Sequence, residues 1–107
     1  MARGKHLGEF EQLVMLAVLR LGNEAYGMTV RRELEDTAGR RATIGSVYGT
    51  LERLEEKGLV RSWWGDPDPV RGGRARRYFQ VERAGEAALA AARARIDRMW
   101  EGVEVRT

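Results

Sequence analysis

Apolar positions recur at helical spacing along much of the chain, and glycine follows most of these stretches. The first, Glu9–Leu21, is apolar on nearly every side in its second half, which predicts a helix buried on two faces. The second, Tyr26–Thr37, repeats apolar residues at i, i+4 and i+8 and is closed by Gly39. The inner faces predicted for these two helices are Phe10, Leu13, Val14, Ala17 and Leu21, and Tyr26, Val30 and Leu34.

A third helix is predicted to begin after Thr43, a good N-cap residue, and to stop at Gly58, which tolerates the left-handed cap conformation. Small or polar residues near its start would let the backbone approach a nucleic-acid groove, and a helix N-terminus favours phosphate. Tyr48 lies at the edge of the apolar stripe, where it either packs on the core rim or offers its hydroxyl to a phosphate. The predicted inward stripe is Ile44, Val47, Leu51 and Leu54, and the outward residues are Gly45, Ser46, Gly49, Thr50 and Arg53.

Two short apolar and aromatic stretches, Leu59–Trp64 and Arg76–Val81, predict an antiparallel hairpin. The loop between them carries four arginines and no acid from position 71 to 77, so it is either a phosphate-binding tip or a solvated basic loop. Trp63 and Trp64 are adjacent on a strand and point to opposite faces, so we expect one in the core and the other over the last helix. The four arginines are Arg71, Arg74, Arg76 and Arg77.

The last predicted helix, Arg83–Gly102, has seven alanines between positions 84 and 94, so its helix propensity is high. Its apolar residues follow the a/d spacing of a coiled-coil seam, and a partner subunit is the expected cover. The interface predicted for a homodimer combines Leu13 and Ala17 of the first helix with Leu89, Ala92, Ile96, Met99, Trp100 and Val103.

A helix followed by a basic-tipped hairpin is typical of a winged helix-turn-helix, so the predicted fold class is α+β, mostly α. The expected organisation is a mobile N-terminus at 1–8, a DNA-binding domain of three helices and a two-stranded wing at 9–81, and a C-terminal dimerisation helix and tail at 82–107. The recognition helix would enter the major groove, and the wing would follow the phosphates.

Charge placement favours a nucleic-acid partner more than net charge does. The 107 residues carry 19 basic and 16 acidic groups, for a net charge of +3. The window Arg40–Tyr78 holds nine basic and five acidic residues, which gives 9 − 5 = +4. Cysteine is absent and His6 is the only histidine, so no thiolate metal site, His-based metal cluster or His-based catalytic triad can form within one chain. We expect neither a metal nor a cofactor. Acid pairs such as Glu55 and Glu56 are adjacent on a helix and do not face each other, so they are interpreted as solvated surface and an enzyme is not expected. Without a signal peptide or a membrane span, the expected location is the cytoplasm.

Three motifs together resemble the PadR family of bacterial transcriptional regulators: Tyr26-Gly27, the run from Ser46 to Val60, and Gly72-Gly73-Arg74 with Arg77-Tyr78. The single helix after the wing is similar to the compact members of that family. The resemblance implies a homodimer held by the first and last helices and an operator bound by the third helix and wing. It also implies repression that is usually relieved by a signal. Two departures are Glu82, where the family commonly caps with Thr or Ser, and Gly49, where a bulkier or polar residue is frequent.

We therefore expect a repressor that binds double-stranded DNA at a pseudo-palindromic operator; the alternative is a winged-helix module for protein–protein contact. Compact members of the resembled family often bind planar aromatic compounds at the dimer interface, which implies an effector site at Ile96, Met99 and Trp100. Trp100 would otherwise fill the dimer core. The expected DNA contacts are Tyr26, Thr43, Ser46, Tyr48, Gly49, Thr50, Arg53, Arg71, Arg74 and Arg76.

Overall fold

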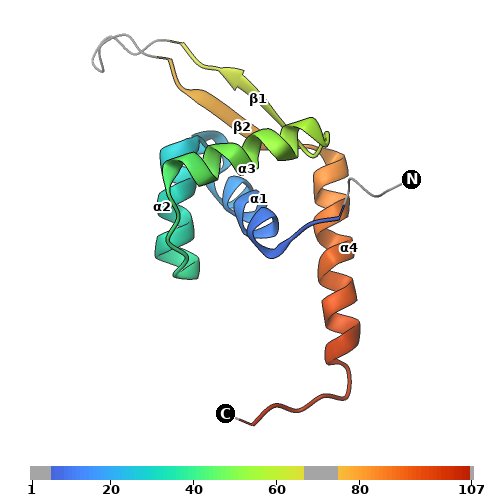
Figure 1. Cartoon of the computed structure of the whole chain (residues 1–107). Coiled ribbons are helices and arrows are strands. Elements are labelled where there is room, and N and C mark those ends of the chain that lie inside the picture. Colours follow the sequence, from blue (N-terminus) through green and yellow to red (C-terminus); the bar gives the residue numbers. More distant parts are fainter. Residues whose placement is uncertain (1–5, 67–74, 107) are drawn as a thin grey trace.

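The structure is a computed structural model that describes residues 6–66 and 75–106 (Figure 1). Three α-helices, a two-stranded antiparallel sheet and a last helix follow one another as in the predicted winged helix-turn-helix. The elements, in chain order, are α1 (Glu9–Leu21), the 3-10 turn η2 (Gly22–Glu24), α2 (Gly27–Ala38), α3 (Ile44–Glu56), β1 (Val60–Trp64), β2 (Arg77–Val81) and α4 (Arg83–Trp100).

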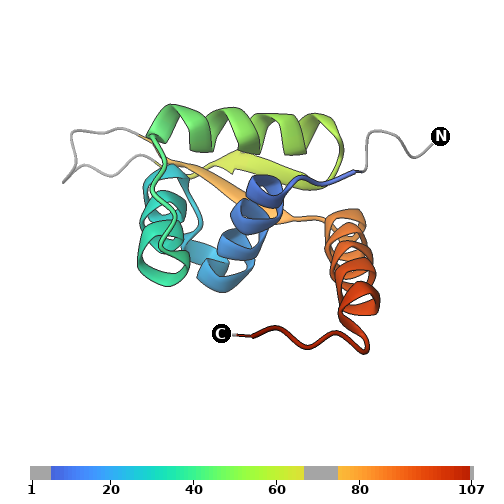
Figure 2. The same ribbon diagram turned by 60° about the horizontal axis from the view of Figure 1, so that its bottom comes forward.

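Helix α1 forms the centre of the core, with α2, α3 and β2 packed around it (Figures 1 and 2). Its buried side chains include Met15 and Val18, which the predicted inner face left out. Leu16 and Leu19 remain 44% and 43% exposed, so the described chain leaves the second face of α1 incompletely covered, and cover by another subunit stays a prediction. The N-terminal segment predicted to be mobile contributes Leu7 to the core.

The predicted capping residues end the helices as expected. The Thr43 hydroxyl accepts a hydrogen bond from the Ser46 N–H at 3.0 Å, which satisfies a free donor in the first turn of α3. Gly58 takes a φ of 77°, and the Leu59 N–H then bonds back to the Leu54 carbonyl at 2.9 Å. Both ends of the predicted recognition helix are therefore fixed by local chemistry.

The inward stripe of α3 differs from the predicted one at two positions. Val47, Leu51 and Leu54 are fully buried as predicted, but Ile44 is 37% exposed. Thr50, predicted to face outward, is only 1% exposed. The buried face is rotated toward Thr50 because α3 packs across both α1 and α2, and Ile44 lies beyond that contact at the first residue of the helix.

The hairpin pairs in register from Val60↔Val81 to Trp64↔Arg77, and the Gly65 N–H extends it by bonding to the Arg76 carbonyl at 2.8 Å. The other edge of β2 is also occupied, because the Phe79 N–H bonds to the Ala25 carbonyl at 2.9 Å. Phe79 is the buried centre of the sheet.

Neither tryptophan of β1 is in the core. Trp63 is 41% exposed and stacks on Tyr78 with 6.2 Å between ring centroids, and Trp64 is 67% exposed. The expectation of one core tryptophan and one over the last helix is wrong, because Phe79 and Val81 of β2 and Val60 of β1 already supply the core side chains of the sheet.

Helix α4 leaves the sheet after a single residue, Glu82, and extends away from the other helices (Figure 2). The Glu82 N–H bonds to the Leu59 carbonyl at 2.8 Å, and Glu82 provides no side-chain cap. The helix ends at Trp100, two residues before the predicted end, so Val103 lies past it. Among the helices of the described residues, none is long and apolar enough to cross a membrane.

Candidate nucleic-acid interface

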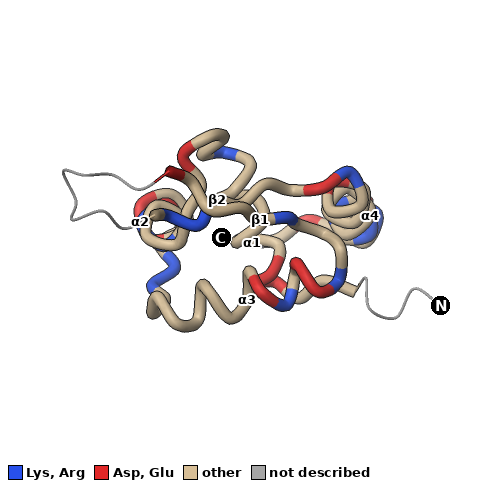
Figure 3. Tube along the Cα trace, turned by 90° about the horizontal axis from the view of Figure 1, so that it is seen from above, with Lys and Arg blue, Asp and Glu red and all other residues tan. Residues whose placement is uncertain are grey.

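The outward face of α3 begins with small residues and bare backbone. A Cβ built on Gly45 would meet nothing within 4 Å, and Ser46 beside it is exposed. Figure 3 shows the acidic residues of α3 confined to its C-terminal half. The N-terminal half, which carries free N–H groups and the positive end of the helix dipole, is thus open to an anionic partner.

Arg53 and Thr50 form one unit on α3. The Arg53 Nη2 atom donates to the Thr50 hydroxyl at 3.0 Å, and the Arg53 side chain is exposed while that of Thr50 is buried. The prediction that Thr50 faces outward is therefore wrong, and its side chain leaves almost no exposed surface for a groove contact. Thr43, Ser46 and Arg53 are exposed and Gly49 is half-buried, and their contact with a groove stays a prediction.

Tyr26, Tyr48 and Arg76, three predicted DNA contacts, line one hollow of about 610 Å³ between the start of α2, α3 and the hairpin. The Arg76 guanidinium lies over the Tyr26 ring at 4.3 Å, a cation–π contact that fixes the arginine. The Tyr26 ring in turn meets Tyr78 edge-on, with centroids 5.7 Å apart. These cation–π and edge-on contacts hold the base of the wing against the start of α2.

The Tyr-Gly pair at the start of α2 has a packing explanation. A Cβ on Gly27 would lie 2.4 Å from Cζ of Tyr48, so the absence of a side chain at Gly27 leaves space for that ring. Tyr48 also tilts against Phe79 at a centroid distance of 6.4 Å and is half-buried. The core-rim contact considered for Tyr48 is present in the structure.

Arg77, counted with the basic loop by sequence, instead anchors the wing to α3. Its Nη2 lies 2.8 Å from Glu55 Oε1 and its Nη1 3.4 Å from Glu52 Oε2. The Ser62 hydroxyl lies 3.1 Å from Arg77 Nε and 2.8 Å from Glu55 Oε1. Sequence reasoning interpreted Glu55, together with Glu56, as solvated surface and assigned no partner to Glu52. The available signal was an acid pair one helical turn apart with an unassigned arginine on the following hairpin.

A second partly buried ion pair ties α1 to the end of α3, with Lys57 Nζ 2.9 Å from Glu11 Oε2. Burial by itself raises the pKa of Glu11. Hydrogen bonds from Lys57 and the Gly8 N–H, with the charges of Lys57 and Arg53, outweigh burial and bring the pKa below its ordinary value of 4.5.

The predicted dimer residues differ in how much surface they leave for a partner. Ala17 and Ala92 are 3% exposed and already buried within the chain, so they have almost no surface left for a partner. Leu89 lines a groove of about 580 Å³ between α1 and α4, together with Leu16 and Leu19 of α1, which the prediction missed. Leu13 is half-buried and lines another hollow, between α1 and α2. The remaining predicted residues, Ile96, Met99, Trp100 and Val103, are 57%, 77%, 54% and 52% exposed.

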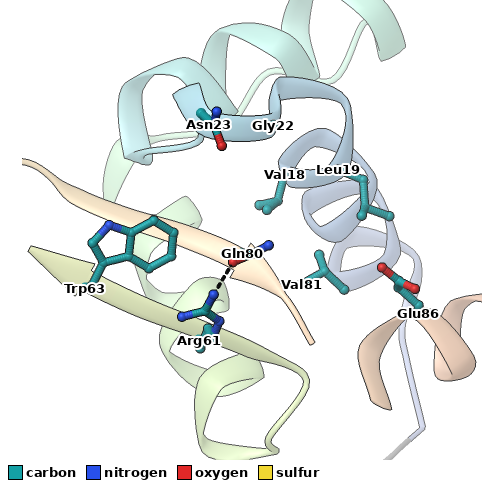
Figure 4. Close-up of a pocket in the computed structure, with 9 residues that line it drawn as sticks. All are labelled: Val18, Leu19, Gly22, Asn23, Arg61, Trp63, Gln80, Val81 and Glu86. Carbon is teal, nitrogen blue, oxygen red and sulfur yellow. Dashed lines mark hydrogen bonds between the residues drawn. The ribbon is translucent and has the colours of Figure 1, made fainter. Parts of the chain in front are cut away.

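A polar pocket of about 470 Å³ lies between the end of α1, the hairpin and the start of α4 (Figure 4). Arg61 hydrogen-bonds Gln80 across the strands, and its guanidinium lies 5.2 Å from the Trp63 ring centroid. Figure 4 shows Glu86 at the opposite end of this pocket from Trp63. This pocket is lined by both a basic residue, Arg61, and an acidic residue, Glu86, whereas the start of α3 carries no acid.

Two further expectations concern the arginines of the wing loop and a metal site. Arg71 and Arg74 lie outside the described residues. In the part of the chain that the structure describes, no three His, Asp or Glu side chains gather as they would around a metal ion.

The amino-acid sequence is similar to those of known proteins. The model of the transcriptional regulator PadR-like family matches residues 15–91. The transcriptional regulator Rv3488 of Mycobacterium tuberculosis is 42% identical over 67 residues, which span 63% of this chain and 58% of that protein.

Solved structures show the same fold. A PadR-like transcription factor from Bacteroides fragilis superposes with a TM-score of 0.70 at 25% identity, covering 86% of this chain and 84% of that one. A PadR family transcriptional regulator from Eggerthella lenta gives 0.68 at 29% identity, covering 88% and 81%. The chain therefore belongs to the PadR-like family of transcriptional regulators, and DNA-binding regulation of transcription is the function of that family.

Proposed function

We propose that this chain is a homodimeric repressor that binds a pseudo-palindromic operator in the cytoplasm. The observation that carries the proposal is the start of α3, where small exposed residues without acids lie beside the base of the wing. The backbone there approaches a duplex without steric obstruction, and the α3 N-terminus supports phosphate binding.

The proposed DNA contacts come from α3, α2 and the wing. The major-groove contacts are Thr43, Ser46, Gly49 and Arg53. Tyr26 and Tyr48 contact the DNA on the side of α3 that faces the hairpin. Arg76 approaches the phosphates from the wing base, and the sequence adds Arg71 and Arg74 as further phosphate or minor-groove contacts. Thr50 is no longer among the contacts, because it is buried.

A dimer is proposed because α4 exposes large apolar side chains that nothing in the described chain covers. Ile96, Met99 and Trp100 are more than half exposed, and the groove between α1 and α4 continues the same apolar surface. A two-fold dimer presents two α3 helices, so its half-sites should lie about one helical turn apart, roughly 34–36 Å. The dimer seam also offers the proposed effector site for a planar aromatic compound at Ile96, Met99 and Trp100.

The proposal is tested by selecting bound sequences from a random DNA pool and measuring affinity against salt concentration. The selected site should contain an inverted repeat, and log K should fall linearly with log salt because bound phosphates release counterions. Arg74→Ala should weaken binding to every sequence and reduce the salt slope by about one, whereas Arg95→Ala on α4 should leave both unchanged. If the selection enriches no sequence and binding does not depend on salt, the protein–protein module is favoured instead.

A further inference from the structure

The Thr50 hydroxyl is a buried polar group whose hydrogen-bond partner in the structure is a side chain that faces outward. It is enclosed at 1% exposure, and Arg53 Nη2 donates to it at 3.0 Å from one turn further along α3. The hydrogen bond draws the guanidinium back toward the N-terminal half of the helix. An unsatisfied buried hydroxyl is costly, so this contact favours one conformation of Arg53 over the many that an exposed arginine samples.

Gly49 lies beside the Arg53 guanidinium in that conformation. A Cβ at Gly49 would lie 3.7 Å from Arg53 Nη1 and would meet no other atom within 4 Å. The guanidinium therefore lies beside bare backbone. A duplex close enough to contact Gly45 and Gly49 meets the edge of the Arg53 side chain.

The donors left on Arg53 suit a base edge. A guanidinium has five N–H donors, and Thr50 accepts from one of them. The remaining donors on Nη1 and Nη2 match the O6 and N7 acceptors of guanine in the major groove. Glu52, which pairs with Arg77, and the exposed Glu56 lie on the same half of α3 as Arg53, and they repel a charged phosphate more than an uncharged base edge.

We infer that Arg53 reads a guanine in each operator half-site and that Thr50 is the positioning residue that sets the orientation of Arg53. This inference rests on the proposed DNA-binding function and adds a base identity to it.

The test compares full-length variants on the selected operator and on duplexes with one base pair replaced at a time. Thr50→Val keeps shape and burial but removes the acceptor, so discrimination for guanine at one base pair per half-site should fall about 3- to 10-fold. Arg53→Ala should remove roughly 5- to 150-fold of discrimination at the same base pair. Thr50→Ser keeps the hydroxyl and should restore the wild-type preference, and Thr50→Val should add nothing in the Arg53→Ala background.

Thermal unfolding of each variant separates loss of fold from loss of reading, since a merely structural Thr50 would change stability and leave the base preference unchanged. That result would overturn the inference. So would an Arg53→Ala variant that binds all sequences more weakly and has a salt slope lower by about one, because Arg53 would then be a phosphate contact. Wild-type protein without salt-dependent DNA binding would overturn the proposed function, and this inference with it.

Discussion

At the scale of single residues, two glycines in the first turn of a helix have opposite surroundings. A Cβ on Gly85 of α4 would lie 2.3 Å from the Leu59 carbonyl oxygen and 2.8 Å from Met15 Cε, whereas Gly45 of α3 has nothing within 4 Å. Gly85→Ala should therefore lower the free energy of unfolding by about 1–3 kcal/mol through overpacking.

The matched control, Gly45→Ala, should raise stability by roughly 0.4–1 kcal/mol, because its helical backbone suits alanine and the unfolded chain loses freedom. Urea unfolding of both variants measures the difference. Equal effects at the two glycines would show that α4 does not approach the Leu59 backbone as closely as described.

The sequence determines the residue-scale picture only in part. A helix advances 100° per residue, so the neighbours Leu16 and Ala17 point to different sides although both are apolar. In a helix as uniformly apolar as α1, spacing alone does not select which side faces the core. The exposure of Leu16 and Leu19 and the burial of Thr50 depend on packing between elements, which the pattern within one helix does not contain.

At the scale of elements, the Glu11–Lys57 pair links two helices and makes stability depend on pH. Because the folded-state pKa of Glu11 is below its ordinary value of 4.5, the pair contributes stability that is present above that value and lost as pH falls through the lower pKa. Glu11→Gln should cost about 1 kcal/mol at neutral pH, and the difference from wild type should shrink in acid below about pH 4.5.

Chemical denaturation at several pH values measures that difference, and the same series in a Lys57→Met background is the control. Without the ammonium group of Lys57, Glu11→Gln should have a smaller effect at neutral pH. A difference between wild type and Glu11→Gln that stays constant from neutral to acid pH would contradict the assigned pairing.

Element boundaries were the most predictable part of the fold, because they are set by local chemistry. Thr43, Gly39 and Gly58 end helices through their own conformations and hydrogen bonds, and the structure confirms these ends. The wing anchor was not predicted, because Arg77 and Glu55 are 22 positions apart, and the acid pair on α3 does not by itself indicate which arginine of the hairpin it binds. The same holds for the two tryptophans, whose burial depends on which side chains fill the sheet first.

At the scale of the whole molecule, the apolar stripe of α4 requires a cover. Ile96→Glu would place a charge in the proposed seam and should yield monomers, because burying an unpaired carboxylate costs several kcal/mol. Arg95→Glu, the adjacent exposed position, is the control and should leave the dimer intact. Sedimentation at micromolar concentration measures both, and a wild-type monomer under these conditions would exclude the seam.

Trp100 reports on the proposed effector site. A planar cationic dye or a flavin-like compound that binds at the seam should quench tryptophan fluorescence, and Trp100→Ala should abolish that quenching while Trp63→Phe and Trp64→Phe retain it. Met99 beside it adapts to ligand shape through its flexible thioether. If a broad panel of planar compounds changes neither fluorescence nor DNA affinity, Trp100 fills the dimer core and the signal lies elsewhere.

The single-residue connection at Glu82 has a mechanical consequence. One residue separates β2 from α4, and the Glu82 N–H donates to the Leu59 carbonyl, so we expect the last helix and the wing to move together. The 18 residues of α4 span about 27 Å. If α4 pivots by roughly 10° about its C-terminal end, its N-terminal end, to which the wing is joined, moves by about 5 Å. That displacement exceeds the 3.4 Å rise of one base pair. In the proposed dimer, a slight change in how the two α4 helices cross would therefore move the half-sites out of register and release the operator.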